Sequence, residues 1–149
     1  PVDRRQRQMC IRDRLCSCTR PAEETWLNKE MQASYTQLAK HGHCHSVEVW
    51  HDEQLIGGLY GISVGQLFCG ESMFSLKDNA SKIALWYLCE HLATNLGQLI
   101  DCQIMNPHLA SLGALELDRD DFIQKLLSLR GKKMNVGTLE PQILQGALS

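Results

Sequence analysis

Two blocks of polar residues end otherwise apolar segments of this 149-residue chain, and each block runs into the start of a helix. The first block is Gly-Glu-Ser-Met-Phe-Ser at 70–75, followed by Asn-Ala-Ser-Lys at 79–82. The second is Ile-Asp-Cys-Gln at 100–103, followed by Asn106, His108 and Ser-Leu-Gly-Ala at 111–114. Chains give up strand propensity in this way where a site lies. We therefore expect a functional site where these two strands end.

The hydrophobic periodicity around these blocks predicts a sheet covered by helices. A helix, three strands joined by short turns, a helix and a fourth strand follow one another, which is typical of an α/β or α+β sheet with helices on its faces. Glycines at 57, 58 and 61 in the second strand predict a bulge or a close approach of another backbone or of a ligand. The expected strands are 46–50, 55–62, 66–74, 99–104 and 115–117, and we expect the strand at 99–104 to be central. The expected helices are 25–40, 80–96, a short one that begins at Pro107, and 118–129. In the last helix we expect Phe122, Ile123, Leu126 and Leu127 to face inward.

Composition is that of a soluble globular domain, with 44% hydrophobic and 21% charged residues. No run of about 18 apolar residues is present, so no membrane-spanning helix and no membrane partner are expected. Seven cysteines are many for this length, and Cys44, Cys69, Cys89 and Cys102 stand singly in apparent strands and helices or at their edges. This pattern suits free thiols in a reducing compartment, and it predicts a cytoplasmic protein.

Charge is unevenly distributed. Residues 1–20 have a net charge of +4, whereas the remainder of the chain has a net charge of −6. A basic arm on an acidic body is compatible with nucleic-acid binding, but an arm without periodicity or interleaved aromatic residues favours a disordered tail. We therefore expect residues 1–22 to be a disordered or non-native segment, 23–130 to be the folded domain, and 131–149 to be a C-terminal tail.

Several familiar kinds of site are not supported by the motifs. The run His41, Gly42, His43, Cys44, His45 has no second pair of ligands at zinc spacing, so no metal site is expected. The glycines at 57–61 are not followed by the Lys-Ser/Thr of a phosphate loop, and no G-x-S-x-G elbow of a serine hydrolase occurs. Asp101 and His108 could form an acid–base pair, although a structural role for the histidine is favoured.

Glu71 and Asp101 are carboxylates placed in, or at the end of, apolar strands. Such a group must be paired, hydrogen-bonded or shifted in its pKa. From the pattern alone, a buried network that ties the two strands together and a functional site are equally compatible with this placement.

Five motifs taken together carry more information. They are His-Ser-Val-Glu-Val-Trp at 45–50, Gly-Gly-Leu-Tyr-Gly at 57–61, the block at 70–75, Asn-Ala-Ser-Lys at 79–82, and the block that runs from Ile100 to Ala114. In this order and spacing they closely resemble the leucyl/phenylalanyl-tRNA–protein transferase family, over about residues 23–130. The resemblance implies a domain with a GNAT-like (acyl-CoA N-acyltransferase-like) mixed sheet and helices on both faces.

The resemblance also implies an activity and a set of site residues. The family moves Leu or Phe from aminoacyl-tRNA to the N-terminal Arg or Lys of a protein, which marks that protein for degradation by the bacterial N-end rule. No cofactor is implied, because the reaction converts an ester into an amide. Asp101 and Gln103 match the proton relay, and Glu71 matches the residue that attracts the cationic acceptor. The substrate-binding residues implied are Trp26, which matches a tryptophan near the terminal adenosine, and Leu59, Phe68, Gly70, Ser72, Met73, Leu85, Leu88, Ile100 and Asn106.

Family members carry a further N-terminal domain with additional tryptophans, to which residues 1–22 do not correspond in their motifs. We therefore expect an N-terminally truncated chain that contains the catalytic domain and is a monomer. Two alternatives remain: a GNAT-like N-acetyltransferase that uses acetyl-CoA, and an inactive tRNA- or peptide-binding remnant. The first needs a Gly-rich pyrophosphate loop, which 75–80 do not supply.

Overall fold

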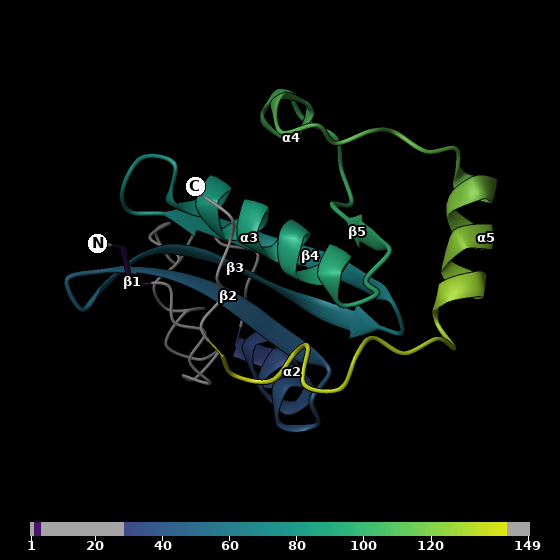
Figure 1. Cartoon of the computed structure of the whole chain (residues 1–149), viewed down its shortest axis with the longest axis horizontal. Helices are drawn as coiled ribbons and strands as arrows, with labels where there is room; N and C mark the ends of the chain where they lie inside the picture. Colours follow the sequence, from purple (N-terminus) through teal and green to yellow (C-terminus); the bar gives the residue numbers. More distant parts are fainter. Residues whose placement is uncertain (1, 4–28, 143–149) are drawn as a thin grey trace.

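A computed structural model describes residues 2–3 and 29–142, which form one twisted sheet with a helix on each face (Figure 1). The five strands lie in the order β1-β2-β3-β4-β5. Their bounds, with those of the helices, are β1 Val2–Asp3, α2 Lys29–Lys40, β2 Cys44–His51, β3 Gln54–Val64, β4 Leu67–Ser75, α3 Ala80–Thr94, β5 Leu99–Asp101, α4 Pro107–Ser111 and α5 Arg119–Leu129.

Strand directions make this a mixed sheet. Strands β1 to β4 are antiparallel neighbours, whereas β5 runs parallel to β4 after the α3 crossover. Asp52 and Glu53 both have positive φ, the geometry of the tight turns that join twisted antiparallel strands. The expectation of an α+β fold with a mixed sheet and helices on both faces is confirmed.

Alternation along the strands places one core on each face of the sheet. Val47, Val49 and Leu59 pack with the inner face of α3, which contributes Ala84 and Leu88. Residues of the opposite parity, including Cys44 and Tyr60, pack against Tyr35 of α2. Because side chains alternate along a strand, β2 and β3 can serve both cores at once. The sheet is therefore a layer between two helices.

The glycine-rich β3 has both features that its sequence predicts. Its own bulge is at Ile56, because Val49 pairs with Gly57 and Trp50 pairs with Leu55. A second bulge lies opposite β3, on β4. Tyr60 pairs with Ser72 and Gly61 pairs with Gly70, so Glu71 is an extra residue on β4 and forms a β-bulge. A Cβ atom on Gly61 would lie 2.2 Å from the carbonyl oxygen of Cys69. Glycine thus permits the close approach of β3 to β4 beside the bulge.

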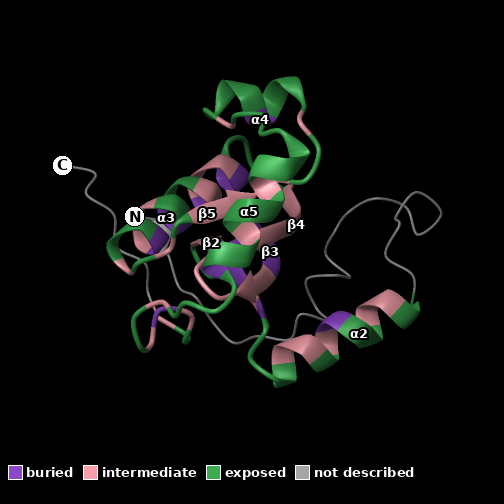
Figure 2. Ribbon diagram, turned by 90° about the vertical axis from the view of Figure 1, so that its right-hand side faces the viewer, coloured by how far each residue is buried: buried purple, intermediate pink, exposed green. Residues whose placement is uncertain are grey.

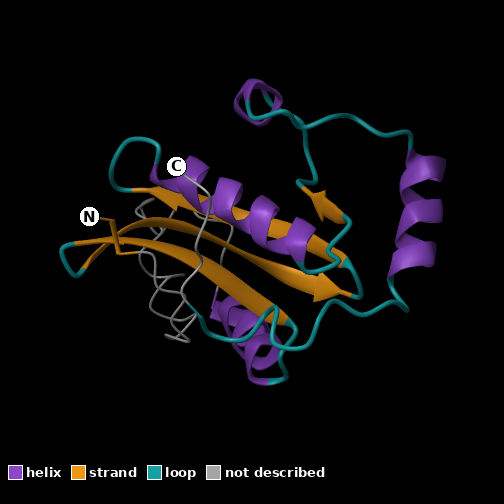
Figure 3. Ribbon diagram, in the orientation of Figure 1, coloured by secondary structure: helices purple, strands orange, loops and turns teal. Residues whose placement is uncertain are grey.

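Three predictions about the second half of the chain are wrong. The strand expected at 99–104 ends at Asp101, and β5 lies at the edge of the described sheet rather than at its centre. Residues 115–117 form no strand but belong to the loop between α4 and α5 (Figure 3). Helix α5 stands apart from the sheet in Figure 1, and most of it is coloured as exposed in Figure 2. Ile123 and Leu127 are 37% and 53% exposed, whereas Phe122 and Leu126 are half-buried. Alternation in so short a segment cannot identify a strand without a partner to pair with.

The segment after α5 is fixed to the domain as far as residue 142, although its sequence has no period. Met134 and Leu139 pack against the core on the α3 face. Thr138 is buried, and its carbonyl oxygen lies 2.7 Å from Nε2 of His91 on α3. In the described part of the chain, no helix has the length and apolar character needed to cross a membrane.

Candidate active site

A cavity of about 470 Å³ lies where β4 and β5 separate. The two strands pair only from Leu67 with Leu99 to Cys69 with Asp101, and β4 then continues to Ser75 without β5. Helix α3 covers one side of the gap and the segment from Cys102 into α4 covers another. The lining residues are Leu59, Phe68, Gly70, Glu71, Ser72, Met73, Leu85, Leu88, Ile100, Cys102, Gln103, Ile104, Asn106, His108 and Leu109.

The inner wall of the cavity is apolar and comes from four elements. Phe68 of β4 and Leu88 of α3 are 1% and 2% exposed, and Leu59 of β3 is buried beside them. Met73, Leu85 and Ile100 are partly buried and pack against the same core. All six residues belong to the substrate-binding set that the family resemblance implies, and they lie around a single cavity.

Glu71 lies at the cavity on the β4 bulge, and it is anchored by a residue that the sequence does not single out. The hydroxyl of Tyr35 on α2 donates a 2.7 Å hydrogen bond to Oε2 of Glu71. Burial, followed by the hydrogen bond and the charge of Glu71, raises the pKa of Tyr35 well above its usual value. The phenol therefore remains a donor to the carboxylate at neutral pH. Tyr35 and Tyr60 also make an edge contact, with ring centroids 5.5 Å apart.

Asp101 and Gln103 are linked, but not in the way that their spacing predicts. We expect both on one face of a strand, whereas β5 ends at Asp101 and Gln103 follows with φ +63°. The backbone N–H of Gln103 donates to Oδ1 of Asp101 at 2.8 Å, which forms a short turn. The side-chain Nε2 of Gln103 donates to the carbonyl oxygen of Gly70 at 3.0 Å. Gln103 therefore bridges β4 and the end of β5 at the cavity.

The remaining predicted site residues divide into three groups. Gly70 and Ser72 line the cavity from β4. Asn106 also lines it and is the N-cap of α4, where its Oδ1 accepts the N–H of Leu109 at 2.9 Å. Asp101 is beside the cavity without lining it, and Trp26 lies outside the described residues.

Four lining residues are absent from the predicted set: Cys102, Ile104, His108 and Leu109. Cys102 lies between the two predicted relay residues, so its position in the sequence already indicates that it is near the site. His108 was considered as a partner of Asp101 but not assigned to the site. Ile104 and Leu109 carry no sequence signal for a site, because an isolated aliphatic residue in a loop or short helix is equally compatible with packing.

The thiols near the cavity are poorly suited to nucleophilic catalysis. Burial, followed by the charges of Asp101 and Glu71, raises the pKa of Cys69 to about 11. Burial and Asp101 likewise raise the pKa of Cys102. The thiolate is the reactive form of cysteine, and a raised pKa makes it scarce at neutral pH. Neither thiol is therefore expected to act as a nucleophile at the cavity.

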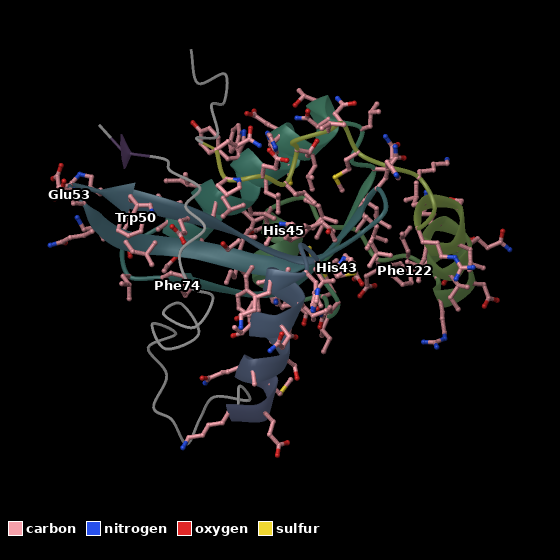
Figure 4. The ribbon with its side chains drawn as sticks, turned by 90° about the horizontal axis from the view of Figure 1, so that it is seen from below. His43, His45, Trp50, Glu53, Phe74 and Phe122 are labelled. Carbon is pink, nitrogen blue, oxygen red and sulfur yellow. The ribbon has the colours of Figure 1, made fainter. Side chains whose placement is uncertain are left out.

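The histidine run is away from this chemistry. His43 and His45 lie on the ribbon near α2 (Figure 4). Nε2 of His45 is 3.1 Å from the hydroxyl oxygen of Ser63, and burial lowers the pKa of His45. Within residues 2–3 and 29–142, no group of three or more His, Cys, Asp or Glu residues is placed to hold a metal ion.

Comparison with known proteins points to one family. The family model described as Leucyl/phenylalanyl-tRNA protein transferase matches residues 8–127, a range that begins inside the segment left out of the motif resemblance. Curated relatives of that name from Vibrio campbellii and Vibrio parahaemolyticus are 83% and 78% identical over 135 residues, which are 91% of this chain and 57% of each relative. One from Vibrio cholerae is 65% identical over 129 residues, 87% of this chain and 53% of the relative.

The chain thus spans somewhat more than half the length of the curated relatives it matches. Most of its own length is matched by the family model, and the matched range contains both polar blocks and every residue that lines the cavity. This chain belongs to the leucyl/phenylalanyl-tRNA–protein transferase family.

Proposed function

We propose that this chain carries the transfer centre of an enzyme that moves Leu or Phe from aminoacyl-tRNA to a protein with N-terminal Arg or Lys. The observation that carries the proposal is one cavity with a deep apolar wall and with Glu71 and Gln103 at its polar side. The apolar wall suits the Leu or Phe side chain of the donor. Hydrophobic pockets separate similar apolar side chains by only about 1–3 kcal/mol, which agrees with a donor set of two amino acids.

The chemistry asks for positioning and for a route for a proton. The α-amino nitrogen of the acceptor attacks the ester carbonyl carbon, the new C–N bond forms, and the C–O bond to the ribose breaks. A free α-amino group has a pKa near 8, so the acceptor must lose a proton before attack, and the ribose oxygen must gain one as it leaves. Nε2 of Gln103 already donates to the carbonyl oxygen of Gly70. Its Oε1 is therefore the atom that accepts a hydrogen bond from the α-amino group of the acceptor.

Asp101 supports this arrangement by holding the backbone of Gln103 in place. Its Oδ1 accepts the backbone N–H of Gln103 and holds the turn in which Gln103 lies. The carboxylate stabilises the positive charge on the attacking nitrogen, and it relays the proton together with Gln103. Such positioned acid–base groups contribute on the order of 10²- to 10⁴-fold to a rate.

Glu71 suits the cationic side chain of an N-terminal Arg or Lys. One of its oxygens accepts from Tyr35, and a carboxylate has capacity for further donors on the other oxygen. Arginine pairs with carboxylates through two parallel hydrogen bonds, whereas lysine acts as a point charge. Leu59, Phe68, Gly70, Ser72, Met73, Leu85, Leu88, Ile100 and Asn106, with Trp26, remain our proposed donor-binding set.

The acetyl-CoA alternative is disfavoured by the start of α3. A pyrophosphate needs open backbone N–H groups at a helix N-terminus or in a Gly-rich loop. Here the Ser75 hydroxyl oxygen accepts the N–H of Ser81 at 2.9 Å and donates to the Ser81 hydroxyl at 2.8 Å. The backbone N–H of Ser81 is thus already bonded within the chain and is not open to a phosphate group. The relatives also carry the name of the aminoacyl transferase.

The remaining parts of the proposal follow from the substrates. Aminoacyl-tRNA and acceptor proteins are the partners, and no cofactor is needed because the aminoacyl ester is already activated. Ordinary free thiols such as Cys44 agree with a cytoplasmic protein. We propose that residues 23–130 form a GNAT-like catalytic domain, and the separation of β5 from β4 supports this fold. We also propose that the protein is a monomer.

Transfer of labelled Leu from Leu-tRNA to an Arg-terminated peptide tests the proposal. Asp101→Asn keeps an acceptor for the N–H of Gln103 but removes the charge, and it should lower kcat by about 10²-fold or more. Gln103→Ala should have a similar effect. Asp118→Asn and Gln124→Ala are matched controls at exposed positions of the α5 region and should leave the rate unchanged.

Three results would contradict the proposal. Equal activity of the Asp101 and Gln103 variants with the unaltered chain would remove these residues from the reaction. Acetyl transfer from acetyl-CoA without leucyl transfer would establish the acetyltransferase alternative. A folded chain that transfers nothing would be the inactive remnant.

A further inference from the structure

A group of cations follows α5 on a molecule that is otherwise slightly acidic. Arg130, Lys132 and Lys133 are all exposed, and we call them the basic turn. From residue 122 to residue 139 the chain has four Lys or Arg residues, the fourth being Lys125, and no Asp or Glu, whereas the whole chain has a net charge of −2. Within the described residues, no carboxylate forms an ion pair with the basic turn.

The helix dipole accounts for only one of these cations, Arg130, which is the C-cap residue of α5. Positive side chains stabilise a helix from its last turn, and the effect falls off beyond that turn. The last turn of α5 contains no basic residue, and Lys132 and Lys133 lie three and four residues beyond its end at Leu129. Like charges so close together repel one another, and no carboxylate among the described residues offsets that repulsion.

The basic turn is held firmly against the strands that frame the cavity. Nε2 of Gln66 donates to the carbonyl oxygen of Lys133 at 3.0 Å. The backbone N–H of Gln66 donates to the carbonyl oxygen of Leu129 at 3.2 Å. Gly65 approaches so closely that a Cβ atom there would lie 2.1 Å from the Leu129 oxygen. The carbonyl oxygen of Gln66 in turn accepts the N–H of Gln98, just before β5.

These contacts hold the backbone of the basic turn near the strand that lines the cavity. Gln66 immediately precedes β4, and the cavity lining on that strand begins at Phe68 and continues through Gly70. At about 3.3 Å per residue, four residues of strand span roughly 13 Å. Helix α5 stands at the end of the sheet where β4 begins (Figure 1). If one end of an RNA lies in the cavity, phosphates only a few nucleotides away from that end can therefore reach the basic turn.

We propose that the basic turn binds the phosphate backbone of the aminoacyl-tRNA whose aminoacyl end occupies the cavity. This inference rests on the proposed function, because it takes the donor to be an RNA. Lys and Arg bind phosphates without regard to base sequence, so the contact positions the donor and does not select it. Three neutralised phosphates release condensed counterions, and they contribute about 2 to 3 to the slope of log affinity against log salt.

The test compares binding of Leu-tRNA by two triple variants between 50 and 200 mM NaCl. Arg130→Gln/Lys132→Gln/Lys133→Gln removes the basic turn and keeps hydrogen-bonding side chains of similar length. Lys29→Gln/Lys40→Gln/Lys77→Gln removes three cations elsewhere and is the matched control. The first variant should bind at least tenfold more weakly at 50 mM, with a salt slope smaller by about 2 to 3. The control should show a smaller change in both quantities.

Leucyl transfer from 3′-leucyl-adenosine, which has no phosphate, separates this inference from the function on which it rests. The basic-turn variant should use this donor as well as the unaltered chain does. An affinity and salt slope equal to those of the unaltered chain would overturn the inference, as would an unaltered chain that binds no Leu-tRNA at 50 mM salt. Failure of the unaltered chain with both donors would contradict the proposed function, while the binding comparison would still decide the inference.

Discussion

At the scale of single residues, the hydrogen bond between Tyr35 and Glu71 joins α2 to the cavity across the sheet. A hydrogen bond to a charged group contributes about 1.5–3 kcal/mol when it is made. It also restricts the rotamers of Glu71, which we propose as the group that binds the acceptor. Tyr35 is therefore a positioning residue, because it acts through Glu71.

Tyr35→Phe should lower the free energy of unfolding by about 1–2 kcal/mol and raise KM for the Arg-terminated acceptor more than it lowers kcat. In the double variant Tyr35→Phe/Glu71→Gln, the loss should be smaller than the sum of the single losses, because the two changes remove one interaction. Urea unfolding and acceptor titration measure these quantities. Additive losses would contradict a direct interaction.

The raised pKa of Tyr35 adds a pH dependence to the same comparison. Its folded-state pKa is above its unfolded value near 10, so its contribution to stability is complete below about pH 10 and declines as the pH rises beyond it. The stability difference between the unaltered chain and Tyr35→Phe should therefore be constant from pH 6 to 9 and shrink in more alkaline solution.

The sequence predicted the carboxylates at and beside the cavity better than it predicted their hydrogen-bond partners. Glu71 and Asp101 were recognisable because a carboxylate in an apolar strand must be compensated. Tyr35 was not, since the choice of partner depends on where α2 packs against the sheet. The geometry of Gln103 was also hidden, because a positive φ outside glycine has little sequence signature.

At the scale of elements, the close approach of β3 and β4 beside the bulge depends on Gly61. A methyl group there would lie 2.2 Å from the Cys69 carbonyl oxygen and 2.5 Å from the Phe68 ring. Gly61→Ala should therefore lower the free energy of unfolding by about 1–3 kcal/mol. Gly131→Ala is the control, because nothing lies within 4 Å of its Cβ position. Equal stability of the two variants in urea would show that the strands can separate at no cost.

Hydrophobic period and turn residues predicted most elements and placed their ends closely. Strands β2, β3 and β4 and helices α3 and α5 all occur within two residues of the expected bounds. The errors concern 99–104 and 115–117, where the pattern is too short to reveal whether a partner strand exists. Strand β5 ends early because the chain leaves β4 at the turn that Asp101 and Gln103 form.

At the scale of the whole molecule, the segment after α5 closes the domain. Leu139 packs against the core, Thr138 meets His91, and Gln66 binds Lys133. Its sequence gave no sign of this, because contacts made residue by residue with distant partners produce no period. We expected only a tail from residue 131, and nothing in the pattern distinguished Leu139 from the exposed Val136.

Leu139→Ala should lower the free energy of unfolding by about 1–3 kcal/mol, less than for a fully buried leucine, because Leu139 is only partly buried. Val136→Ala is the matched control, since Val136 is fully exposed, and it should change stability by less than about 0.5 kcal/mol. Thermal and urea unfolding report both values. Indistinguishable variants would mean that the segment does not contribute to the stability of the domain.

The bulge at Glu71 also sets the phase of β4. Phe68 and Gly70 face the α3 side, and strict alternation would continue with Ser72. The extra residue shifts the count by one, so Met73 packs with the α3 core while Ser72 pairs with Tyr60 of the α2 cluster. Deleting Glu71 would therefore restore plain alternation without moving any other residue: Ser72 would still face α2 and Met73 would still face the apolar wall. The bulge can thus carry a carboxylate at the cavity while the packing of the strand on either side of it stays the same.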